Sequence, residues 1–208
     1  MTHLICPGMP VYPGTDGPIF EQAGVLERDG YEEKRIIIHT HNGTHVDAPR
    51  HLIKGGMCLD EFQMEAFMGR GVVLDFSGFD NGTISGSDLL EREYSIIGNE
   101  FVLLYTGWDK YWGSEQYYHG YPVLSPEAVD YLLDNFQLKG VGGDFISMDA
   151  PGRQLKNHTA FLGKGILIVE NLMNLHLLLN RPFSFICLPL KLEDSDGAPA
   201  RAAAVLDW

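Results

Sequence analysis

Residues 39–51 read His-Thr-His-Asn-Gly-Thr-His-Val-Asp-Ala-Pro-Arg-His, which places four histidines and one aspartate close together in the chain. The β-branched residues before and within this segment, the glycine inside it and the proline near its end disfavour a helix. In an extended chain alternate side chains point to the same face, so we expect His41, His45 and Asp47 to lie together. Gly43 allows the backbone to bend around a common centre.

This cluster of imidazoles and a carboxylate predicts a metal site. Nitrogen and oxygen donors suit a divalent ion such as Zn²⁺ or Mn²⁺, whereas a structural zinc site usually contains cysteine thiolates. The three cysteines, Cys6, Cys58 and Cys187, lie far apart in the sequence and predict free thiols of a reducing compartment. A single histidine is more often structural than a ligand, so the prediction of a catalytic ion depends on the whole cluster.

Composition narrows the classes of partner. The 208-residue chain has a formal net charge of −13 at pH 7, which repels phosphate backbones, so we expect no nucleic-acid partner. The most apolar stretch, residues 165–179, is interrupted by polar side chains, so we expect no membrane partner either. Residues 1–7 lack a basic region and contain a proline, which predicts no signal peptide and a cytoplasmic location.

Segments typical of strands outnumber those typical of helices. Runs rich in β-branched and aromatic residues predict strands at 35–40, 71–76, 101–106, 140–144, 165–170, 183–190 and 200–207. A cap, a first-turn proline and an early acid at residues 125–127 predict a helix, and further helices are expected from 87 to 92 and after Asn171. No repeat or linker divides the chain, so we expect one α/β domain with few helices.

The pattern His-x-Gly-Thr-His-x-Asp-Ala-Pro-x-His at residues 41–51 resembles the signature of the cyclase-like metal-dependent hydrolases, the family of bacterial kynurenine formamidase and isatin hydrolase. Other segments are similar to the family as well: residues 10–14, 106–108, 143–149, 188–191 and 198–202. The resemblance covers essentially the whole chain. It implies a single compact domain over residues 1–208, with an α/β fold of the swivelling β/β/α type.

The resemblance also implies a set of ligands. His41, His45 and Asp47 would hold one ion, and Asp47 would bridge to a second ion held by His158 and Glu170. The family places a glutamate twelve positions after the histidine of this second half-site, as His158 and Glu170 are placed here. From residue chemistry alone these two are only possible ligands, because Glu170 could equally be a solvated strand end. The resemblance leaves open whether one or two ions bind, and whether they are Zn²⁺ or Mn²⁺.

His51 is the last histidine of the matched pattern, and the resemblance does not require it to be a ligand. In the family this position transfers a proton close to the ion, so the resemblance implies that role for His51. A divalent ion acidifies water and polarises a carbonyl, and an imidazole with an ordinary pKa of about 6.5 can accept a proton and return it to a leaving nitrogen. The expected activity is hydrolysis of an amide, formamide or lactam C–N bond in a small molecule, as in an arylformamidase.

The sequence also offers candidates for the walls of a substrate pocket and for a subunit interface. Several aromatic residues lie near matched segments and could line a pocket or equally pack in the core: Trp108, Tyr111, Trp112, Tyr117, Tyr118, Phe145 and Phe161. In the family the amino-terminal loop of one subunit helps to close its neighbour's pocket, which implies a homodimer or higher homo-oligomer with Tyr12 and Pro13 near the interface.

Two alternatives stay open: a lyase or cyclase acting on a hydroxylated carbonyl compound, and a metal-binding protein without turnover. An unligated His51 beside the ion argues against the second, since pure binding does not need it. The chain has no nucleophile elbow and no zincin helix motif. A cupin would need a glutamate soon after its histidine pair, where this chain has Thr44 and His45.

Overall fold

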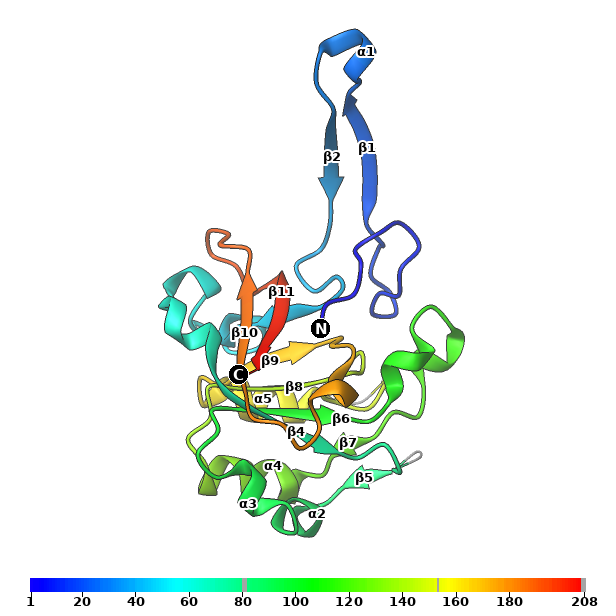
Figure 1. The fold of residues 1–208 in the computed structure, drawn as a ribbon. Helices are drawn as coiled ribbons and strands as arrows, with labels where there is room; N and C mark the ends of the chain where they lie inside the picture. The colour runs from blue at the N-terminus through cyan, green and yellow to red at the C-terminus, as the bar shows by residue number, and fades with distance from the viewer. Residues whose placement is uncertain (80–81, 153, 207–208) are drawn as a thin grey trace.

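Seven strands close into a barrel in the order β10-β11-β3-β9-β8-β6-β4 (Figure 1). The computed structural model describes residues 1–79, 82–152 and 154–206. The barrel strands are β3 (His45–Asp47), β4 (Met68–Asp75), β6 (Phe101–Tyr105), β8 (Gly140–Gly143), β9 (Leu167–Glu170), β10 (Phe183–Pro189) and β11 (Gly197–Leu206). Neighbours from β4 to β9 run parallel, while β3, β10 and β11 join the barrel through antiparallel pairs.

Alternation along the strands divides the apolar core into two clusters. In β6, Phe101 and Leu103 face a cluster inside the barrel, whereas Val102 and Leu104 face a cluster shared with the helices outside it. Parallel strands that are buried on both faces read as continuous apolar runs. This explains why six of the seven expected strands coincide with barrel strands, with ends that differ by a few residues. The strand-rich α/β fold in one compact domain is confirmed.

The helices are short and few in the described part of the chain: α1 (Leu26–Asp29), α2 (Gly86–Leu90), α3 (Glu93–Ile96), α4 (Pro126–Asn135) and α5 (Lys156–Gly163). The best-signalled helix, α4, begins as predicted, with Ser125 accepting a hydrogen bond from the backbone of Ala128. The expected helix after Asn171 is wrong. Asn171 and Asn174 adopt left-handed φ angles of 56° and 61°, which break a helix and leave only a 3₁₀ turn at Leu175–Leu178.

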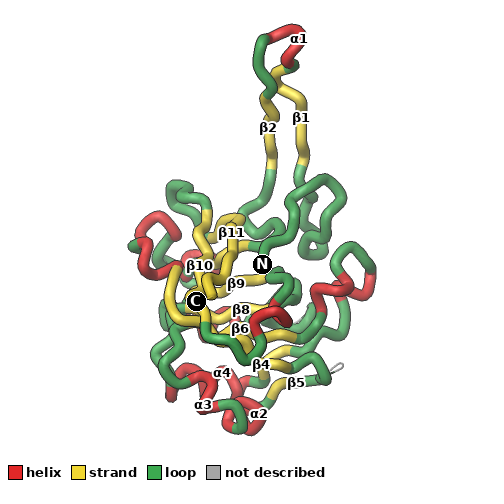
Figure 2. Tube along the Cα trace, in the orientation of Figure 1, coloured by secondary structure: helices red, strands yellow, loops and turns green. Residues whose placement is uncertain are grey.

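A two-stranded arm extends away from the barrel (Figures 1 and 2). β1 (Ile19–Gly24) pairs antiparallel with β2 (Glu33–Ile37), and α1 caps the far end. The strand expected at 35–40 therefore belongs to this arm and not to the core, and every residue of β2 is exposed. A second small sheet pairs β5 (Thr83–Ile84) with β7 (Val123–Leu124). None of the helices in the described ranges has the length and apolarity to cross a bilayer.

The buried ring of His3 predicts acid sensitivity of the fold. It stacks on Trp112, with ring centroids 3.8 Å apart, and its Nε2 has no hydrogen-bond partner. Burial lowers the pKa of His3 to about 4, so the unfolded chain takes up a proton between pH 6.5 and 4 that the folded chain does not. Stability is therefore kept above pH 6.5 and lost as the pH falls toward 4.

Between pH 7 and pH 5 the free energy of unfolding should fall by about 1–2 kcal/mol more in the wild type than in His3→Phe. Denaturant titrations at both pH values measure this difference. The exposed His119 provides the control, because His119→Phe should behave as the wild type. An equal fall in the wild type and His3→Phe would contradict the assignment.

Candidate metal centre

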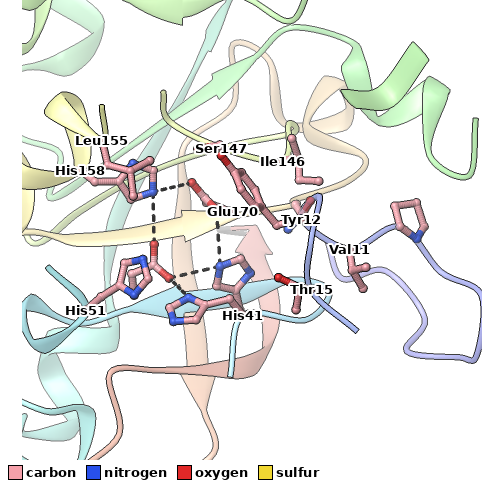
Figure 3. A pocket seen from close by; sticks show the side chains of 14 residues that line it. Val11, Tyr12, Thr15, His41, His51, Ile146, Ser147, Leu155, His158 and Glu170 are labelled. Atoms are coloured by element: carbon pink, nitrogen blue, oxygen red, sulfur yellow. Dashed lines mark hydrogen bonds and ion pairs between the residues drawn. The ribbon is translucent and has the colours of Figure 1, made fainter. Parts of the chain in front are cut away.

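Four of the predicted ligands come from two paired strands and one helix. His45 and Asp47 lie on β3, and His45 sits directly opposite Glu170 of β9 in the antiparallel register. Side chains on one face of such a pair are close neighbours. His158 reaches the same place from α5, whose start carries no side-chain cap, so this helix lacks the capping signal that marks α4. Figure 3 shows His158 and Glu170 turned toward each other.

His41 arrives by a different route from the one its spacing predicts. Only residues 45–47 are extended, whereas residues 40–44 form a turn and bends, with Gly43 at a φ of 71°. The expectation of an extended chain from His41 onward is therefore wrong, whereas the expected bend at Gly43 is present. Glycine adopts this left-handed conformation without the cost of a Cβ, and the turn carries the His41 ring back to the cluster.

Asp47 lies at the centre of the cluster. Its Oδ1 is 2.7 Å from His41 Nδ1 and 3.2 Å from His45 Nε2, and its Oδ2 is 3.6 Å from His158 Nε2. Glu170 closes the other side, with Oε1 2.9 Å from His158 Nε2 and Oε2 3.5 Å from His45 Nε2. The structure thus brings together all five predicted ligands, which lie up to 129 positions apart, from residue 41 to residue 170.

An acceptor outside the cluster orients each imidazole. His45 Nδ1 donates to the carbonyl oxygen of Gly43 at 2.8 Å, and His158 Nδ1 donates to Asp149 Oδ2 at 2.7 Å. His41 Nε2 donates to Asp196 Oδ2 at 2.9 Å. Since one nitrogen of every ring is held in this way, the other faces the centre, which is the arrangement that metal-binding histidines use.

The electrostatics favour a cation. Burial by itself lowers the pKa of His41, but the carboxylates of Asp196 and Asp47 outweigh it and raise the pKa to about 10. Burial also lowers the pKa of His158, but the carboxylates of Glu170 and Asp149 outweigh it and raise the pKa to about 10. Both shifts report an excess of negative charge around the rings.

The donors also fit a divalent ion chemically. Three triads of described residues have ligand atoms within 4.8 Å of one another: His41, His45 and Asp47 form the first, Asp47, His158 and Glu170 the second, and His41, His51 and Asp196 the third. The first two consist of the predicted ligands. Asp47 Oδ2 is buried without a hydrogen-bond partner, and a buried carboxylate oxygen left in this way is costly. Nitrogen and oxygen donors of this kind match Zn²⁺ or Mn²⁺.

His51 stands beside the five. Its Nδ1 lies 3.4 Å from Asp196 Oδ2, and its ring centroid is 4.1 Å from that of His41. It lines the same cavity as the cluster, so it can reach a molecule bound there. His39, by contrast, is exposed. Its backbone N–H donates to Asn42 Oδ1 and its carbonyl accepts from the Asn42 N–H.

The cavity over the cluster has a volume of about 190 Å³. Its walls are largely apolar and come from the amino-terminal loop and from the segments after β8: Pro10, Val11, Tyr12, Thr15, Ile146, Ser147, Leu155 and Asn171. Among the described residues that line it, none is one of the seven aromatic candidates. Of the two alternatives left open for them, core packing holds for Tyr117, Phe145 and Phe161, which are fully buried. Tyr12 lines the pocket of its own chain.

Two acidic side chains that hold the histidines are absent from the predicted set. Asp149 ends the segment 143–149 that resembles the family. It lies nine residues before His158, and this short separation could have pointed to it as a partner of that histidine. Asp149 also accepts hydrogen bonds from the backbone of Asn157 and His158. Asp196 lies 155 residues from His41, and no spacing in the sequence could join them.

Comparison with known proteins identifies the family of the chain. The Cyclase family model, described as "Putative cyclase", matches residues 1–150. The chain belongs to this cyclase family. An uncharacterized protein from Methanocaldococcus jannaschii is 32% identical, over 94% of this chain and 92% of its own length. The kynurenine formamidase of Erythrobacter litoralis is 28% identical, over 97% of this chain and 90% of its own.

A solved structure extends the similarity to three dimensions. An isatin hydrolase bound to the product analogue thioisatinate superposes on this member of the cyclase family with a TM-score of 0.87. The two are 25% identical, and the match covers 99% of this chain and 91% of the other. The resemblance found in the sequence is thereby confirmed at the level of family and fold.

Proposed function

We propose that the chain is a metal-dependent hydrolase that cleaves the C–N bond of an amide, formamide or lactam in a small molecule. One observation supports this above the others: two groups of ligands share Asp47 at the floor of an apolar cavity, and His51 stands beside them. Relatives that share the family and fold are a kynurenine formamidase and an isatin hydrolase, whose names describe such reactions.

His41, His45 and Asp47 would hold one divalent ion, and Asp47, His158 and Glu170 a second. We infer Zn²⁺ or Mn²⁺ from the donor types. Such an ion supplies electrophilic chemistry, since it polarises a carbonyl and acidifies water. Glu170 also accepts a hydrogen bond from the backbone of Met148 at 2.8 Å, which keeps its carboxylate in place.

His51 would move the proton. Its Nδ1 faces Asp196, so its Nε2 is the atom left to accept a proton from the attacking water and return it to the departing nitrogen. The apolar walls at Val11, Ile146 and Leu155 limit the water that reaches the carbonyl. A cavity of about 190 Å³ restricts the substrate to a small molecule.

A direct assay tests this proposal. Protein stripped with a chelator and reloaded with Mn²⁺ or Zn²⁺ is offered formylated arylamines, isatin-like lactams and hydroxylated carbonyl compounds. Turnover of the first or second group with either ion, and none in the stripped protein, is expected. Loss of water from the third group alone would indicate a lyase. Full metal content without turnover on any compound would indicate a binding protein.

We further propose that the chain works as a homodimer in the cytoplasm. All three cysteines are free thiols, in keeping with a reducing compartment. An isolated two-stranded arm is marginally stable in water, and this one exposes Ile19, Leu26 and Ile36 at 50%, 61% and 51% of their surface. A second copy of the chain would cover these apolar groups.

The arm therefore predicts the oligomeric state. The double variant Leu26→Lys, Ile36→Lys should be monomeric, because charged ammonium groups oppose burial in an interface. Light scattering coupled to size exclusion measures the mass directly. Tyr94→Lys is the control: Tyr94 lies on α3, off the arm, and is 92% exposed, so this variant should keep the wild-type mass. A wild type that is itself monomeric at micromolar concentration contradicts the prediction.

A further inference from the structure

Asp196 places one carboxylate oxygen between two imidazoles that have different tasks. Its Oδ2 lies 2.9 Å from His41 Nε2 and 3.4 Å from His51 Nδ1. The two rings lie side by side, with centroids 4.1 Å apart. His41 belongs to the predicted ligand set, whereas His51 does not, so Asp196 connects the two functions through a single atom.

The backbone holds Asp196 in this position. Its carbonyl accepts a hydrogen bond from the Ala48 N–H at 2.9 Å, directly after β3. The preceding residue, Ser195, accepts from Leu59 N through its carbonyl, also at 2.9 Å. The following residue, Gly197, pairs with Asp47 in the register of β11 and β3. The carboxylate is thus tied to the strand that carries the central ligand.

Gly197 brings the His41 ring close to this backbone. A Cβ built on Gly197 would lie 2.6 Å from Cε1 of His41, closer than any side chain tolerates. The imidazole therefore packs directly over the glycine, and its Nε2 meets the carboxylate of the neighbouring Asp196. The position of the His41 ring therefore depends on two adjacent residues: Gly197, which has no side chain, and Asp196, which supplies the acceptor.

The chemistry of the acceptor explains why it is an aspartate. An ionised carboxylate only accepts hydrogen bonds and has lone pairs for several donors. Accepting from His41 Nε2–H leaves His41 Nδ1 facing the centre, and accepting from His51 Nδ1–H leaves His51 Nε2 free for a proton. An asparagine carries no negative charge and has one carbonyl oxygen where the aspartate has two carboxylate oxygens, so it accepts more weakly from both rings.

We propose that Asp196 is a positioning residue shared by the ligand His41 and the proton-transferring His51. It fixes the tautomer and orientation of both rings through one carboxylate oxygen. This rests on the proposed function for the His51 half, while the His41 half concerns ion binding alone.

Ion affinity tests the first half without any turnover. Mn²⁺ binding to the stripped protein is measured by calorimetry in the wild type and in Asp196→Asn. The variant should bind about 10–100-fold more weakly, as expected when the outer partner of a metal-binding histidine is mutated. Asp194→Asn removes the same charge from an exposed neighbour and should bind as the wild type. Equal affinity in the wild type and Asp196→Asn overturns the proposal.

A double-mutant cycle tests the second half. At saturating Mn²⁺, Asp196→Asn should lower kcat at least 10-fold with KM changed less than twofold. In the His51→Ala background the same substitution should change kcat less than twofold, because the ring it positions is gone. Equal losses in both backgrounds overturn the role toward His51, as does an unchanged kcat. A wild type without turnover refutes the proposed function instead, and the Mn²⁺ affinities still decide whether Asp196 positions His41.

Discussion

An Asp47→Ala variant is expected to lose both the bound ion and the activity. Asp47 is the one residue common to both ligand triads, with one carboxylate oxygen toward His41 and His45 and the other toward His158. Removing it takes away the central negative charge that both half-sites share. Elemental analysis after loading should find less than a tenth of the wild-type metal, and kcat/KM should fall by about 10³-fold or more.

The control is Asp134→Ala, which removes an exposed carboxylate from α4 and should keep full metal and rate. Circular dichroism establishes that Asp47→Ala is folded. A folded Asp47→Ala protein with a full complement of metal would refute the shared-ligand arrangement, whatever its rate.

A His51→Ala variant should separate the two properties that Asp47→Ala loses together. His51 lies against Asp196 and the flank of the His41 ring, with its ring centroid 6.3 Å from that of His158. It is not one of the five predicted ligands, so the ion should remain. General acid–base groups contribute about 10²–10⁴-fold to a rate, and kcat should fall within this range. Metal content and steady-state kinetics on one preparation measure both.

His39→Ala is the matched control, since His39 lies in the same segment but is exposed. It should keep both metal and rate. An emptied site in His51→Ala would reassign His51 as a ligand, and a retained rate would remove it from the chemistry altogether.

How far the sequence predicts this molecule depends on whether the relevant signal is local. The barrel strands are predictable because two buried faces leave a continuous apolar run, as in Phe101–Tyr105. The helix α4 is predictable because Ser125 and Pro126 mark its start. Helix α5 is not, because its first turn lacks such a mark, although it carries His158.

The site residues also differ in whether a local signal predicts them. Alternation within β3 places His45 and Asp47 on one face, but it does not place His41, because a turn with Gly43 at positive φ intervenes. His158 and Glu170 follow only from a family resemblance. Asp196 has no signal in the sequence, since only the closure of β11 on β3 brings it to His41.

The brevity of β3 has a consequence for how this chain can change in length. Because His45 and Asp47 point to one side and Val46 to the other, a one-residue slip of the strand between β11 and β9 would send both ligands to the opposite side. Residues 40–44 lead directly into β3 and carry His41, so a single residue inserted or deleted there would either force such a slip or displace the His41 ring. The far end of the arm, around α1, extends away from the barrel (Figure 1), so a change of length there would leave the phase of β3 unchanged.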